Sequence, residues 1–162
     1  MAPGAPAAGP EFTEERPIGE DERSSIAAQV ARLSVPGKVE LAVKGNREVR
    51  RILSRDASSM VARAVIGSPK LSEDDIISYA NSSLTHEEVL RFIADSRQWT
   101  ANRQVVNALV QNPRTPPPAA IRFLKSYQTS ELRVLSQNRS LSAAVRQEAR
   151  RLLAQRHLVL RY

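Results

Sequence analysis

The sequence contains no cysteine and only two histidines, His86 and His157. Without cysteine the chain can form no disulfide, hold no thiolate-bound metal and use no cysteine nucleophile. Two imidazoles are also too few for a metal site built from several histidines. We therefore expect no bound cofactor and no metal centre.

Aromatic residues, glycine-rich loops and long apolar runs are scarce as well. No stretch approaches the roughly 20 apolar residues that a membrane-spanning helix needs. The N-terminal sequence MAPGAPAAGPEF lacks the basic and then apolar segments of a secretory signal. Neither a phosphate-cradling glycine loop nor a nucleophile–base spacing is present. These absences predict a cytoplasmic protein that has no membrane span and is not an enzyme.

The net charge of +7 is divided unevenly. Residues 1–23 carry six acids and two bases, a balance of −4, whereas the remaining 22 bases and 11 acids give +11. A basic body suits an anionic partner, either an acidic protein surface or nucleic acid. The alternative is that a chain rich in arginine and alanine reflects a GC-rich bacterial genome.

Residues 1–23 are rich in proline, glycine and charge. Such a segment buries too little apolar surface to offset its ordering entropy, which predicts a disordered tail. An acidic tail is expected to fold over a basic face and compete with a partner for it. From residue 24 onward the pattern becomes apolar and helical, and residues 24–162 are long enough for one domain.

Short apolar helices alternate with turn and cap signals along this domain. Helix starts at serine or threonine are expected at Ser34, at Ser72 and Thr85, which open capping signatures, and at Thr115. Others are expected at a serine cap near residue 24 and at Thr100, Ser130 and Ser142. Asn112-Pro113 is expected to end a helix, with Asn112 in the left-handed conformation. Each helix has about 8 to 11 residues, below the roughly 12–15 at which an isolated helix is marginal in water. The sequence therefore predicts an all-α stack in which neighbours bury each other's apolar faces.

A shift of 44 residues places residues 61–79 on residues 105–123, which indicates an internal repeat. An Asn-Pro turn followed by a Thr-Pro helix start, at 112–113 and 115–116, resembles leucine-rich-repeat-variant proteins and, more broadly, HEAT and armadillo repeats. The resemblance covers about residues 36–154 and implies a short helical-repeat solenoid with a curved binding surface. The best-known variant-repeat protein also has a cysteine-ligated iron–sulfur segment, which cannot carry over to a chain without cysteine.

Arginines recur at helical spacing in two places. Guanidinium groups bind carboxylates or phosphates bidentately, so such clusters are candidate binding surfaces. The alternative for both clusters is a solvated outer face. The first cluster comprises Arg47, Arg50, Arg51 and Arg55, with Arg63 as its extension, and the second comprises Arg146, Arg150 and Arg151.

Trp99 is the only tryptophan, and Arg97 and Arg103 are close to it in the sequence. A tryptophan flanked by arginines is a candidate binding anchor or base-stacking platform. The alternative is that Trp99 is a core residue before a helix cap. The leading hypothesis is a non-enzymatic scaffold or adaptor that binds an acidic protein partner through the first cluster, Trp99 and Arg103. Nucleic-acid binding on the same face is the alternative. A base-excision enzyme would need a pocket at Trp99 and Asp95 and is the least favoured hypothesis.

Overall fold

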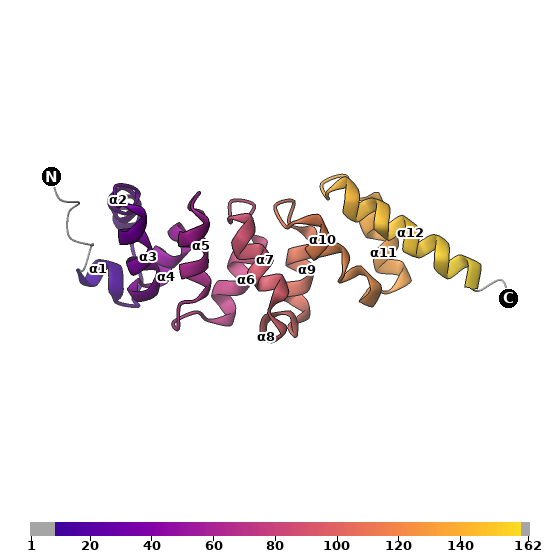
Figure 1. Ribbon diagram of the computed structural model, residues 1–162, viewed down its shortest axis with the longest axis horizontal. Coiled ribbons are helices and arrows are strands. Elements are labelled where there is room, and N and C mark those ends of the chain that lie inside the picture. Colours follow the sequence, from indigo (N-terminus) through magenta and orange to yellow (C-terminus); the bar gives the residue numbers. More distant parts are fainter. Residues whose placement is uncertain (1–8, 160–162) are drawn as a thin grey trace.

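The computed structural model describes residues 9–159, and every regular element in that range is a helix. In Figure 1 the helices lie side by side in chain order from one end of an elongated molecule to the other. The all-α prediction is confirmed. The elements are α1 (Pro10–Thr13), α2 (Glu20–Ala31), α3 (Val35–Lys44), α4 (Arg47–Leu53), α5 (Ser59–Ile66), α6 (Glu73–Asn81), α7 (Glu87–Asp95), α8 (Arg97–Thr100), α9 (Arg103–Gln111), α10 (Pro117–Ile121), the 3-10 helix η1 (Leu124–Ser126), α11 (Thr129–Gln137) and α12 (Ala143–Val159).

The helices form two rows that pack against each other. Helices α3, α5, α7, α10 and α12 contact one another in succession, and α2, α4, α6 and α9 form a second succession. Contacts such as α3 with α4 and α6 with α7 join the rows, and α11 packs against α12 at the C-terminal end. Helices of nine residues are too short to persist alone, so each depends on neighbours in both rows.

The apolar core consists of two clusters of buried residues. The first runs from the N-terminal helix to α10 and contains the fully buried Leu53, Leu90 and Leu109. The second lies around α10, α11 and α12 and contains Leu132. Phe123 packs against both clusters and so connects them. Burial is therefore distributed along the stack, with no single central core.

Turns of equal length connect α4 to α5, α6 to α7, α9 to α10 and α11 to α12. They comprise residues 54–58, 82–86, 112–116 and 138–142, and the last three share one succession of backbone conformations. Their starting points are 26 to 30 residues apart. The 44-residue shift instead matches α5 with α9, which lie in opposite rows. Both matched stretches, residues 61–79 and 105–123, consist of a helix, a turn and a second helix, so a similarity in sequence accompanies a difference in row.

The structure corrects the expected role of Asn112. Its backbone is extended, with φ −77° and ψ 119°, and no non-glycine residue among 9–159 has a positive φ. Its side-chain amide donates hydrogen bonds to the carbonyl oxygens of Ala80, at 2.7 Å, and Ser82, at 3.0 Å. Asn112 therefore satisfies carbonyl groups at the end of α6, because α9 packs directly beside that helix.

Several expected helix starts are also wrong: residue 24 lies inside α2, Thr100 is the last residue of α8, and α11 begins at Thr129 after a cap at Gln128. The start at Ser142 is confirmed, since Ser142 accepts from the amide of Val145.

The expected caps at Thr85 and Thr115 are wrong as well. Thr85 is buried and donates to the carbonyl oxygen of Tyr79 at 2.8 Å, while His86 caps α7 by accepting from the amide of Glu88. Thr115 is buried too, and α10 begins after Pro116. A threonine that faces the core at such a turn cannot also reach the first amides of its helix. The caps at Ser34 and at Ser72, which forms a capping box, are confirmed.

The predicted disordered tail is corrected over residues 9–23, while its residues 1–8 lie outside the described range. Residues 10–13 form α1, and α2 begins at Glu20, so the expected boundary at residue 24 falls inside a helix. One reason is an aromatic anchor. Phe12 is only 2% exposed and belongs to the first core cluster, which offsets the cost of ordering a polar segment.

Candidate functional site

The first arginine cluster does not form one exposed ridge. Arg47, Arg50 and Arg51 lie on α4, whereas Arg55 lies beyond the end of that helix. Because α4 packs against α2, α3, α5 and α6, more than one of its sides is covered. Arg50 is only 2% exposed and points into the packed structure.

Arg50 is the centre of a buried ionic network. Its guanidinium donates to Asp75 Oδ2 at 3.0 Å, to Glu15 Oε1 at 2.8 Å and to the carbonyl oxygen of Gly45 at 2.9 Å. Burial lowers the pKa of Arg50, but the hydrogen bonds to Glu15 and Asp75 outweigh it and leave the pKa raised. Arg50 is therefore a charged structural link between α4 and α6.

Other members of the cluster are engaged to different degrees. Arg47 pairs with Asp75 at 2.9 Å, and Arg51 pairs with Glu48. Arg55 is exposed, and partial burial together with repulsion from Arg51 lowers its pKa. Arg63 is exposed and lies 5.9 Å from the ring centre of Phe92. Of the five arginines of the first cluster and its extension, only Arg55 and Arg63 have no acidic partner among residues 9–159.

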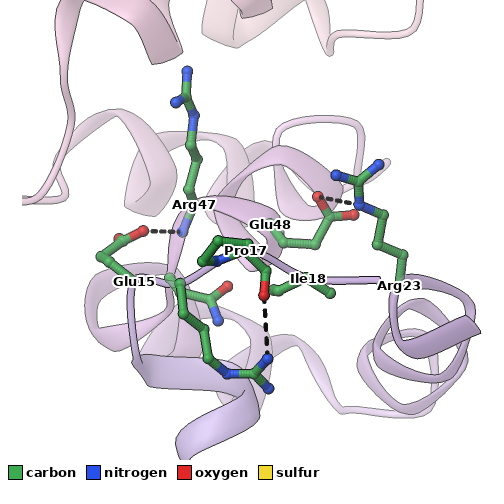
Figure 2. A pocket seen from close by; sticks show the side chains of 8 residues that line it. Glu15, Pro17, Ile18, Arg23, Arg47 and Glu48 are labelled. Atoms are coloured by element: carbon green, nitrogen blue, oxygen red, sulfur yellow. Dashed lines mark hydrogen bonds and ion pairs between the residues drawn. The ribbon is translucent and has the colours of Figure 1, made fainter. Parts of the chain in front are cut away.

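A cavity of about 370 Å³ lies beside the start of α4 (Figure 2). Glu15 approaches the backbone nitrogen of Arg47, at 3.0 Å, while the guanidinium of Arg47 points away from it. Glu48 is held between Arg51 and, at 4.0 Å, Arg23. The carboxylates of Glu15 and Glu48, which line this cavity, are thus already paired with cations or backbone amides. The lining residues are Glu15, Arg16, Pro17, Ile18, Arg23, Asn46, Arg47 and Glu48.

Trp99 and Arg103 also have partners within the chain. Trp99, on α8, is half-buried and packs against the first core cluster. Arg103 lies 4.1 Å from the ring centre of Tyr127 and pairs with Glu131 at 3.2 Å. The structure therefore places Trp99 against the core and does not bring it together with the α4 arginines.

The second cluster lies on α12. Arg151 pairs with Glu148 at 2.6 Å, and Arg150 donates to the carbonyl oxygen of Ser136 at 3.2 Å. Arg146 is half-buried and, like Arg150, has no acidic partner in the part of the chain that the structure covers. Like Arg55 and Arg63 in the first cluster, these two cations are therefore not neutralised by a carboxylate of the described residues.

Charge is distributed unequally along the molecule. Residues 1–96 carry 12 bases and 15 acids, a balance of −3, whereas residues 97–162 carry 12 bases and two acids, a balance of +10. Because the helices follow chain order, this difference separates the two ends of the molecule (Figure 1). Dividing the sequence at residue 23 does not reveal this difference in charge between the two halves. The signal in the sequence is the near absence of acids after Asp95, where only Glu131 and Glu148 follow.

We call residues 97–159 the basic half. It also exposes apolar side chains: Val134 is 68% and Leu158 61% exposed. A cavity of about 670 Å³ near its end is lined by Thr129, Gln155, Arg156, Leu158 and Val159. Free positive charge and exposed apolar surface therefore occur together. Its exposed basic residues without an acidic partner in the described range include Arg97, Arg114, Lys125, Arg133 and Arg139.

Among residues 9–159 no group of three histidine, aspartate or glutamate side chains is arranged to hold a metal ion. In the same range no helix combines the length and apolar character required to cross a bilayer. Comparisons with protein-family models, curated proteins and solved structures find no match. Charge, exposure and packing are therefore the basis for assigning a function.

Proposed function

We propose that this chain is a non-enzymatic interaction module, a scaffold or adaptor that binds an acidic protein partner through its basic half. The observation that carries the proposal is the balance of +10 after residue 96, with exposed arginines that have no acidic neighbour. Such a surface attracts an anionic partner and raises the rate of encounter. Arg55 and Arg63 precede the basic half and lie outside this proposed surface.

The same proposal treats the fold as a short helical-repeat solenoid of the HEAT or leucine-rich-repeat-variant kind, acting in the cytoplasm. Two rows of short helices and turns that recur every 26 to 30 residues support it. Stacks of this kind offer extended surfaces and few enclosed pockets, which suits binding to a protein segment.

An acidic protein fits the basic half better than nucleic acid does. Exposed Val134 and Leu158 can pack against apolar side chains, which a phosphate backbone does not provide. Single-stranded nucleic acid is usually held by exposed aromatic side chains. In the basic half Trp99 and Phe123 are half-buried and Tyr127 is buried. The expected ligand is therefore a segment that carries both carboxylates and apolar residues.

Fluorescence anisotropy with a labelled peptide of alternating glutamate and leucine tests the proposal. Reversing two exposed charges of the basic half, Arg133→Glu with Arg139→Glu, should weaken binding about tenfold or more. The matched control, Arg32→Glu with Arg63→Glu, changes the net charge equally in residues 1–96 and should have little effect.

Equal losses in both variants would refute a localised site. A labelled DNA duplex, titrated at several salt concentrations, tests the alternative. Tighter binding to the duplex than to the peptide, with the steep salt dependence of phosphate contacts, would replace the proposal with nucleic-acid binding.

A further inference from the structure

Residues 9–18 lie on the stack in the way a bound peptide would. The side chain of Phe12 is inserted into the first core cluster. Its carbonyl oxygen accepts a hydrogen bond from the backbone nitrogen of Asn46 at 2.7 Å, and the Asn46 side chain donates to the carbonyl oxygen of Glu11 at 2.8 Å. An apolar anchor is thus combined with main-chain hydrogen bonds, as in many peptide complexes.

A second anchor follows three residues later. The carboxylate of Glu15 accepts from Arg50 Nη1 at 2.8 Å and from the backbone nitrogen of Arg47 at 3.0 Å. Glu14, between the two anchors, is exposed and makes no side-chain hydrogen bond or ion pair within the described range. The segment therefore presents an aromatic residue and a carboxylate at a spacing of three, while a neighbouring carboxylate of the same charge is not engaged.

The receiving side is held in place by contacts that do not involve this segment. Arg50 is fixed by Asp75 at 3.0 Å and by the carbonyl oxygen of Gly45 at 2.9 Å. Asn46 accepts from the backbone nitrogen of Val49 at 3.1 Å, which orients its amide group towards the segment. A site ordered in advance loses less entropy when it binds a ligand.

We propose that Asn46, Arg47, Arg50 and the core surface beneath Phe12 form a peptide-docking groove, which residues 9–18 occupy in cis. Its partner in trans is an acidic peptide that carries an aromatic residue followed three positions later by a carboxylate. Helix α4, which carries Arg47 and Arg50, lies towards the opposite end of the molecule from the C-terminal part of α12, whose residues line the cavity of the basic half (Figure 1). The groove does not depend on the function proposed for that half.

A tethered segment has a high effective concentration, so it competes strongly with any free peptide. The partner binds only when residues 9–18 are released. Weakening the tethered copy should therefore increase the affinity for a free one, which is the opposite of what the loss of a purely structural contact would produce.

The test uses the full chain and a labelled peptide of residues 9–18, GPEFTEERPI. We expect the variant Phe12→Ala with Glu15→Gln to bind this peptide about tenfold or more tightly than the original chain does in anisotropy titrations. Glu15→Gln alone, which keeps the buried Phe12, should give a smaller gain. The matched control Glu14→Gln should leave the affinity unchanged. A peptide that has alanine and glutamine at the two anchor positions should not bind.

Two results would overturn the proposal. If neither variant binds the peptide more tightly while the denaturation midpoint falls, residues 9–18 are only a terminal cap of the stack. If light scattering shows a doubled mass without a gain in peptide binding, the segment exchanges between two copies of the chain. Arg133→Glu with Arg139→Glu should not change binding of this peptide, so failure here is distinguishable from failure of the proposed function.

Discussion

Replacing Arg50 with methionine tests whether the buried network holds α4 against α6. The Arg50 and Asp75 side chains are only 3% and 2% exposed and meet at 3.0 Å. Removing one member of a buried ion pair leaves an uncompensated charge and costs about 3–5 kcal/mol. Asp75 would keep Arg47, whose side chain is 57% exposed, and its capping bond from the Ser72 amide. We therefore expect Arg50→Met to lower the free energy of unfolding by about 3 kcal/mol, near the lower end of that range.

Urea denaturation followed by far-ultraviolet circular dichroism measures this loss, because every regular element of residues 9–159 is helical. The control is Arg122→Met, which breaks an arginine–aspartate pair to Asp95 whose side chains are 44% and 54% exposed. An exposed pair of this kind contributes about 0–1 kcal/mol. Asp75→Asn in the Arg50→Met chain should recover part of the loss, since it removes a buried charge that only the exposed Arg47 still compensates.

Equal effects of Arg50→Met and Arg122→Met would refute the assignment of Arg50 as a structural link. Arg50 would then be a replaceable surface cation, and the predicted ridge on α4 would again be a candidate binding surface. A loss of about 3 kcal/mol should also lower the melting temperature by roughly 6–12 °C for a domain of this size.

Two further predictions concern single side chains. Asn112→Ala should cost about 1–3 kcal/mol, because it leaves the carbonyl groups of Ala80 and Ser82 without their donor. Asn138→Ala, at the corresponding turn position but bonded only to Ser140, should cost less in the same urea assay. Burial raises the pKa of Tyr127 to about 12. Since an unfolded tyrosine ionises near pH 10, stability should fall as the pH rises from about 10 to 12, and Tyr127→Phe should reduce that fall in denaturation midpoints.

The sequence alone determined the helical class and several helix starts. Apolar residues at helical spacing and the caps at Ser34 and Ser72 act over three or four residues, so local physics is sufficient to predict them. The distribution of charge was equally available, since only two acids follow Asp95. Finding it requires counting acids and bases over a longer stretch than residues 1–23.

Only the tertiary structure decided what several polar residues do. An arginine on a short helix can face water or the packed interior, and Arg50 is buried because Asp75, 25 residues away, lies on the adjacent α6. Asn112 bonds to Ala80 for the same reason, across 32 residues of sequence. Phe12 orders a segment whose composition predicts disorder, because the first core cluster has room for its ring. These contacts depend on which helices become neighbours, and local spacing contains no information about that.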